Sequence, residues 1–174
     1  MSDDLTPASP DALLDEIEKQ LETTGLFKSV DQLFGKFRVE DLDRISFKTP
    51  AVFVSIASGK PSIQHNGQLM LECQLAIMLV TSTKDRTGSP WDLSLACTKL
   101  VHRNAFKLAN NRHPQNLNVI PVISSTDRRK NNQLTAITWS QTMRIHEVDR
   151  PVEEIPIVET QDGTVLYTPG ESTE

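Results

Sequence analysis

Cysteine, aromatic residues and long apolar runs are all scarce in this chain of 174 residues. The two cysteines, Cys73 and Cys97, have sequence neighbours that point them inward, which favours reduced core thiols over a disulfide. No apolar run approaches the roughly 20 residues that a membrane-spanning helix needs. The first residues, MSDDLTPASP, carry acids where a signal peptide carries bases. We therefore expect a soluble, intracellularly made protein that has no membrane partner.

The sequence also lacks the motifs of common enzymes and metal sites. There is no G-x-x-x-x-G-K-[ST] phosphate loop, no dinucleotide-binding G-x-G-x-x-G and no G-x-S-x-G nucleophile turn. The spacings H-E-x-x-H and paired C-x-x-C, which mark zinc sites, are absent too. The four histidines are scattered, and the carboxylates of RVEDLDR (38–44) suit a charged surface turn. We expect no enzyme activity, no metal and no cofactor.

Charge is distributed unevenly along the chain, whose net charge is −5. Residues 1–25 have a net charge of −6 and residues 147–174 of −7, whereas residues 26–146 have +8. The acidic ends either keep the protein solvated or lie on a basic surface of the same or a neighbouring subunit. The C-terminal end is richer in apolar residues than a purely solvating tail needs. We expect Val152–Tyr167 to reach a neighbouring subunit, and the candidate contact residues there are Ile155, Ile157, Val158 and Tyr167.

Capping residues predict two amphipathic helices. The first has Ser9 as N-cap and Pro10 at its first position, and Gly25 can end it with a positive φ. The second begins at SPWD with Ser89 as N-cap, and its apolar stripe continues to about Ala109. Each helix has one apolar face, so each needs a sheet or another helix to cover.

Alternation of apolar and polar residues predicts at least four strands. They are expected at Ala51–Ser58, Gln68–Thr83, Leu117–Ser125 and Leu134–Val148. The first two are joined by GKPSIQHNG, whose Gly, Pro and Asn-Gly elements favour a turn, and so form an antiparallel hairpin. Pro121 confines the third strand to an edge or a bulged position.

These elements predict an α+β fold of one domain. It is expected to be a two-layer sandwich, in which a mainly antiparallel sheet of four or more strands carries both helices on one face. We expect residues 1–9 to be a flexible N-terminus, residues 10–148 to form the domain and residues 149–174 to form an extended acidic tail. The segment Leu26–Pro50 is undecided between a short strand and a helical turn.

The strand at Gln68–Thr83 has sixteen residues, whereas ordinary strands have about 5 to 6. Its odd positions are apolar throughout, and its even positions change from polar to apolar at Ala76. This change predicts that something covers the second face at Met78 and Val80. Either a partner subunit contacts these two candidate interface residues, or the segment Leu26–Pro50 of the same chain covers them.

Two basic groups favour contact with nucleic acid. The loop at 127–132 places Arg128, Arg129 and Lys130 on one protrusion, and further basic residues gather at one end of the second helix. The latter are Arg103, Lys107, Arg112 and His113. The acidic total and an aromatic content of 5% argue against sequence-specific recognition, so we expect at most non-specific contact with DNA.

The order of elements resembles that of the tail terminator proteins of contractile-tailed, Mu-like bacteriophages. The segments that carry the resemblance are PAVFVSIAS, VTSTKDRTG, SPWD and ITWSQTMRI. It covers about Pro10–Val148 and rests on pattern and element order. It implies a homohexameric ring at the head-proximal end of the virion tail. Such a ring caps the tail tube, stops tail polymerisation and provides the head–tail joining surface, with no enzyme activity.

The resemblance also implies the partners of the ring. They are the tail tube protein and the head–tail connector or neck protein, with the sheath as a further neighbour. Arg128, Arg129 and Lys130 would face either the tube or the DNA that passes through the channel. Three alternatives stay open: a connector or neck protein with the same ring architecture, a small tube-forming protein, and a nucleic-acid-binding module whose binding weakens with salt.

Overall fold

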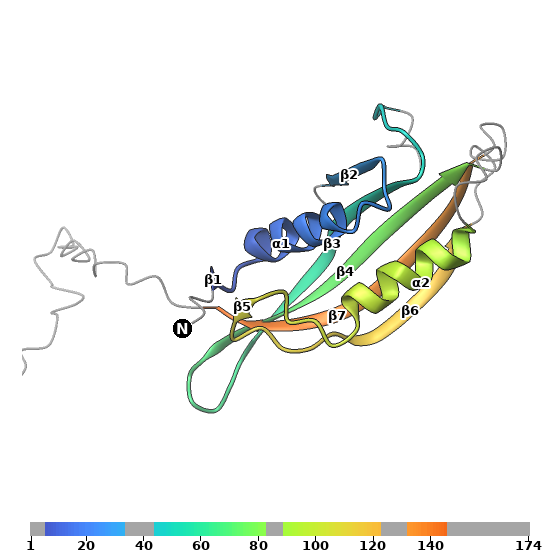
Figure 1. Ribbon diagram of the computed structural model, residues 1–174. Coiled ribbons are helices and arrows are strands. Elements are labelled where there is room, and N and C mark those ends of the chain that lie inside the picture. Colours follow the sequence, from blue (N-terminus) through green and yellow to red (C-terminus); the bar gives the residue numbers. More distant parts are fainter. Residues whose placement is uncertain (1–5, 34–43, 83–88, 123–131, 146–174) are drawn as a thin grey trace, which may run out of the picture.

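The computed structural model describes residues 6–33, 44–82, 89–122 and 132–145 (Figure 1). In chain order, its elements are β1 (Thr6–Pro7), α1 (Pro10–Thr23), β2 (Ser29–Gln32), β3 (Ala51–Ile63), β4 (Leu69–Ser82), α2 (Pro90–Val101), β5 (Leu108–Ala109), β6 (Gln115–Val122) and β7 (Asn132–Arg144). Within these ranges, five strands form an open sheet in the order β2-β3-β4-β7-β6, and β1 pairs with β5. The fold is therefore α+β, as the sequence predicts.

Both helices begin where their capping residues predict. The Oγ of Ser9 accepts a hydrogen bond from the backbone N–H of Ala12 at 3.1 Å. At α2, the Oγ of Ser89 accepts one from the backbone N–H of Trp91 at 3.3 Å. Gly25 follows α1 with φ of 65°, a conformation that glycine adopts without steric cost. The side chains of Ser9 and Ser89 thus satisfy backbone donors that the first helical turn leaves without partners.

The second helix ends at Val101, not near Ala109 as predicted. Arg103, Phe106 and Lys107 have φ values of 56°, 53° and 53°. This left-handed conformation is incompatible with a continuing α-helix. Phe106 is nevertheless fully buried. The apolar spacing beyond Val101 therefore reflects burial in a turn, which sequence periodicity does not distinguish from burial on a helix.

The sheet is mixed. Adjacent pairs β3–β4, β4–β7 and β6–β7 are antiparallel, whereas β2 runs parallel to β3. The strand β2 lies in Leu26–Pro50, so the short-strand alternative for that segment is confirmed. The strand β6 is at an edge, as Pro121 predicts. The hairpin strand β3 extends to Ile63, five residues beyond its predicted end at Ser58.

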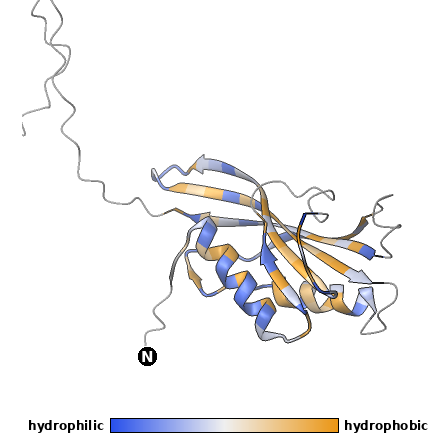
Figure 2. Cartoon of the chain, turned by 90° about the horizontal axis from the view of Figure 1, so that it is seen from above, coloured by the Kyte–Doolittle hydropathy of each residue, from blue (hydrophilic) through white to orange (hydrophobic). Residues whose placement is uncertain are grey.

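One face of the sheet and both helices share the main core. Figure 2 shows the two helices on the same side of the sheet. Leu13 and Ile17 of α1 and Cys97 of α2 belong to one buried cluster with Leu75 and Ile77 of β4. Each fully buried leucine or isoleucine contributes about 1.5–3 kcal/mol to folding. The odd-numbered residues of β4 thus pack beneath the helices, as their apolar pattern predicts.

A second, smaller cluster covers the other face at one end of the sheet. Its members are Ala51, Phe53, Met78, Val80, Leu134 and Ala136, against which Leu33, Ile45, Phe47 and Val122 pack. The rings of Phe47 and Phe53 meet edge to face with centroids 5.4 Å apart. Leu33, Ile45 and Phe47 all come from the segment Leu26–Pro50. This end of the second face is therefore covered by the chain itself.

This packing corrects the interpretation of Met78 and Val80 as subunit contacts. Met78 is only 7% exposed and Val80 is fully buried. The change from polar to apolar residues along β4 marks the boundary of the intrachain cover, which was the alternative explanation. A partner is not needed to explain why these two residues are apolar.

The N-terminal residues 6–9, which the sequence places in a flexible N-terminus, contact the body of the protein. Thr6 and Pro7 pair with Leu108 and Ala109, and Ala8 is buried. The acidic tail at 149–174 lies outside the described residues. Neither helix that the structure describes has the length and apolar content needed to cross a membrane.

Candidate assembly interface

The strands β3 and β4 extend beyond the part of the sheet that the helices cover (Figure 1). The first five residues of β3, Ala51–Ser55, are buried, whereas its last seven, Ala57–Ile63, are exposed. The two strands remain paired to the end, where Ile63 lies opposite Leu69. We call residues 57–72 the hairpin arm. The extra length that the sequence indicates is thus real, but it lies at the opposite end of β4 from Met78.

Local sequence explains how the arm bends and closes. A register shift between Ile56 and Ser58 marks a bulge where the exposed half of β3 begins. On the other side of the arm, Met70–Glu72 of β4 stay paired with β7. At the tip, the N–H of Gly67 donates to the carbonyl of Gln64 at 2.9 Å, and the φ of Gly67 is 79°. The Oδ1 of Asn66 accepts from the N–H of Gln68 at 3.2 Å. This is the turn that the Asn-Gly pair predicts.

The outer edge of the arm has no strand beside it within the described residues. The strand β2 pairs with β3 only over Ala51–Val54. Backbone groups of Ala57–Ile63 therefore form an open edge that another chain can pair with. Pro61 and Lys60 limit indiscriminate pairing, because proline lacks an N–H and lysine adds charge. Ile63, near the tip, is 77% exposed.

A second open edge lies on the opposite side of the sheet. The strand β6 pairs with β7 but with no other strand in the described part of the chain. Ile120 of β6 is 50% exposed, and it lies opposite Ala136 on the face that carries the smaller cluster. Two different open edges on one chain would suit a head-to-tail contact between copies, rather than one patch that meets itself.

Helix α2 also presents apolar side chains to solvent. Trp91 is 64% exposed and Leu95 is 51% exposed. Residues four apart lie on the same helix face, so the two form one exposed apolar pair. The opposite face of the helix carries Leu93 and Cys97, which are buried. The sequence motif SPWD predicts the start of this helix but does not reveal that its tryptophan points outward.

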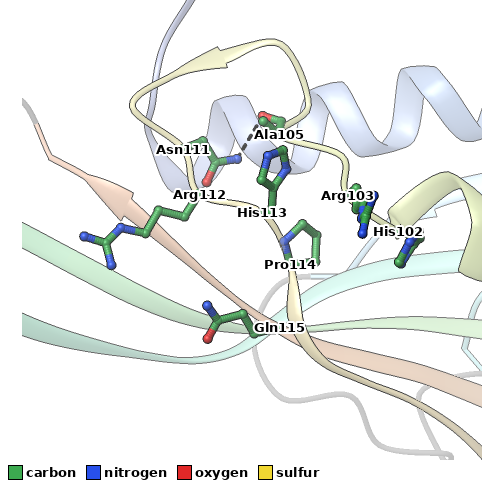
Figure 3. Close-up of a pocket in the computed structure, with 8 residues that line it drawn as sticks. All are labelled: His102, Arg103, Ala105, Asn111, Arg112, His113, Pro114 and Gln115. Carbon is green, nitrogen blue, oxygen red and sulfur yellow. Dashed lines mark hydrogen bonds between the residues drawn. The ribbon is translucent and has the colours of Figure 1, made fainter.

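A basic hollow lies between the end of α2 and the start of β6 (Figure 3). Its volume is about 750 Å³, and it is lined by His102, Arg103, Ala105, Asn111, Arg112, His113, Pro114 and Gln115. In Figure 3, His113 lies between Arg103 and Arg112, whose side chain extends away from the others over the sheet. All four basic side chains are exposed, and none of them forms an ion pair with another described residue.

A buried glutamine fixes the walls of this hollow. The Nε2 of Gln141 donates to the carbonyls of Asn104 at 3.2 Å and of Arg112 at 2.9 Å. Its Oε1 accepts from the indole N–H of Trp139 at 3.1 Å. The Nδ2 of Asn111 donates to the carbonyl of Ala105 at 3.0 Å. The turn after α2 is therefore tied to the interior strand β7.

The sequence predicts the composition of this hollow in part. It groups Arg103, Lys107, Arg112 and His113 at one end of α2, and all of these except Lys107 line the hollow. The sequence predicts the hairpin but assigns Gly59–Gly67 to its turn, whereas β3 continues to Ile63. The length of the arm on the β3 side, its open edge and its exposed tip were therefore not predicted. The remaining candidate residues lie outside the described residues: Arg128, Arg129, Lys130, Ile155, Ile157, Val158 and Tyr167.

Buried thiols are the chemically distinctive groups of the interior. Cys73 and Cys97 are both free and buried. Burial raises the pKa of the Cys97 thiol to about 12 and also raises the pKa of Cys73. Neither is therefore activated as a nucleophile at neutral pH. Across the described ranges, no three His, Cys, Asp or Glu side chains are grouped so that they could hold a metal ion.

The surface features that stand out are thus an arm with an open edge, a second open edge at β6, an exposed apolar pair on α2 and a basic hollow. Each of the first three is suited to contact with another protein chain. No protein-family model matches this chain, and no curated protein matches it either.

Proposed function

We propose that the chain is a phage tail terminator. Identical copies form a closed ring, a homohexamer, at the head-proximal end of the tail. The ring caps the tail tube, stops tail polymerisation and provides the head–tail joining surface. The observation that carries the proposal is the hairpin arm, which extends from the body with an open edge and an exposed tip. The resemblance in element order supplies the identity of the assembly.

The two open edges support a ring in particular. If the arm of one copy contacts the β6 side of the next, every copy uses the same pair of surfaces. Such a head-to-tail contact closes into a ring when the rotation between copies is a simple fraction of a turn. Backbone hydrogen bonds along the arm would provide affinity, and Ile63 would add an apolar anchor. In this proposal, the fold is a two-layer sandwich with both helices on one face of the sheet.

The proposed partners follow from the position of the ring. One side contacts the tail tube protein and the other the connector or neck protein, with the sheath as a further neighbour. Arg128, Arg129 and Lys130 contact the tube or the DNA in the channel without reading its sequence. No bond is made or broken in this activity, so no catalytic residue or cofactor is proposed.

Electron microscopy of tails assembled without this protein tests the function. In a phage that lacks the chain, we expect tails of uncontrolled length, because nothing stops the polymerising tube. Supplying the wild-type chain should restore a single length, whereas a chain with Ile63→Asp should not. Tails of normal length that fail to join heads would instead favour a connector or neck protein. Normal tails joined normally to heads would exclude both.

A further inference from the structure

The C-terminal end of β7 lies directly beside the basic hollow. The N–H of Arg144 donates to the carbonyl of Asn110 at 3.1 Å, and the N–H of Arg112 donates to the carbonyl of Thr142 at 2.8 Å. Asn111 forms a bridge with Met143 in the same place. The chain therefore begins its final segment, residues 146–174, next to the residues that line the hollow.

The charge of this final segment is opposite to that of the hollow. Residues 147–174 contain eight acids and one base, Arg150. The hollow presents two guanidinium groups and two imidazoles, none of which is paired with an acid in the described ranges. Carboxylates are the natural partners of arginine, whose planar guanidinium binds them through two parallel hydrogen bonds.

We propose that the basic hollow is the docking site for the acidic segment Glu153–Asp162 of the same chain. Residues 146–152 connect this segment to β7 and can span up to about 25 Å, which is enough to turn back onto the hollow. A short tether keeps the segment at an effective concentration of the order of millimolar. The segment of the same chain is therefore favoured as the occupant of the hollow over the segment of a neighbouring subunit and over a free anionic partner. This differs from the sequence analysis, which suggests a neighbouring subunit as the contact of the segment.

Several weak contacts together hold the segment in this proposal. Single exposed ion pairs are weak, so the four acids Glu153, Glu154, Glu159 and Asp162 must act together. Apolar residues between them, such as Ile155, can pack against the Pro114 and Ala105 wall of the hollow. Because the contacts are exposed, salt should weaken them strongly, as the screening length falls to about 3 Å at 1 M.

A nitroxide spin label at residue 160 reports whether the segment is docked. Both native thiols are buried, so Thr160→Cys in the full chain introduces a single accessible labelling site. We expect a largely immobilised electron paramagnetic resonance spectrum in 0.05 M salt that becomes mobile in 1 M salt. Arg103→Gln with His113→Gln should make the label mobile at low salt. The matched control, Lys28→Gln with Lys48→Gln, removes two exposed cations elsewhere and should leave the label immobilised.

Three results of the spin-label measurements would overturn the proposal. A mobile label in the wild-type background would show that the segment is not docked. An immobilised label that persists in the Arg103→Gln, His113→Gln variant would place the docking site elsewhere. Finally, labelled chains with the altered hollow can be co-expressed with unlabelled chains whose hollow is intact. If the label is immobilised only in that mixture, the segment docks on a neighbour and not on its own chain.

Measurements of duplex DNA binding distinguish the acidic segment from nucleic acid as the occupant of the basic hollow. If the segment fills the hollow, changing its four acids to amides should increase the salt-sensitive affinity of the full chain for DNA at least several-fold. The Arg103→Gln, His113→Gln change should abolish that increase. Equal affinity of the wild-type and amide chains would mean that the hollow is open to phosphate, which contradicts the proposal. This outcome is independent of whether the protein forms a ring.

Discussion

Gln141 shows how one polar side chain can organise a surface. It is fully buried, and its amide bonds two backbone carbonyls of the α2–β6 connection and the indole of Trp139. We predict that Gln141→Ala lowers the free energy of unfolding by about 2–4 kcal/mol, because buried polar groups lose their partners. Urea denaturation measures this loss. Gln74→Ala, at an exposed position of the neighbouring strand β4, should change it by less than about 0.5 kcal/mol.

Met78 provides a test of the intrachain cover. We predict that Met78→Asp destabilises the folded chain by roughly 3–5 kcal/mol, because a carboxylate enters an apolar cluster closed by Phe47. Gln74→Asp, four residues earlier on the same face, should be tolerated. Urea denaturation of both variants distinguishes them. A Met78→Asp chain that folds normally but fails to assemble would restore the interpretation of Met78 as a subunit contact.

Cys97 makes the stability of the fold sensitive to alkaline pH. Burial raises its pKa from the ordinary value of 9.0 to about 12. Because the pKa is higher in the folded state, this contribution to stability is complete below pH 9 and is lost between about pH 9 and 12. Since one pKa unit corresponds to roughly 1.4 kcal/mol, the loss can reach about 4 kcal/mol. The free energy of unfolding should fall less steeply over this range in Cys97→Ala; equal slopes would contradict the assignment.

The hairpin arm is the element on which assembly depends in this account. Ile63 makes little contact with the rest of the chain, so Ile63→Asp should leave the stability of the monomer within about 0.5 kcal/mol of wild type. It should nevertheless weaken the proposed ring, because a charge would replace the apolar anchor at the proposed interface. Light scattering measures the mass, and circular dichroism confirms the fold. As a control, Leu26→Asp changes an exposed leucine outside the arm and should leave the mass unchanged.

Element starts were predictable from sequence because they depend on local chemistry. Ser9 and Ser89 cap their helices as expected, and Pro121 lies in an edge strand. The end of α2 was not predictable, because Ala105 and Leu108 continue the apolar spacing although the backbone at Arg103, Phe106 and Lys107 is left-handed. The apolar half of β4 was recognised as covered, but whether the cover came from the chain or a partner depends on contacts remote in sequence.

At the scale of the whole molecule, charge distribution was visible in the sequence but its spatial meaning was not. Arg103 and Arg112 are nine residues apart in the sequence. They line the same hollow because the turn after α2 folds against β7. The start of the acidic tail beside them follows from the pairing of Arg144 with the same turn. Hydrophobic and charge patterns indicate which residues need a partner, whereas topology decides which partners are within reach.

The mass of the purified protein in solution is the most direct test of whether the chain assembles through its hairpin arm into a closed ring. We predict a single species of six copies of the 19.5 kDa chain, stable on dilution and reduced to monomers by Ile63→Asp. Native mass spectrometry at several concentrations resolves these states. A wild-type chain that is monomeric at every concentration, or that grows into tubes of indefinite length, would contradict the account.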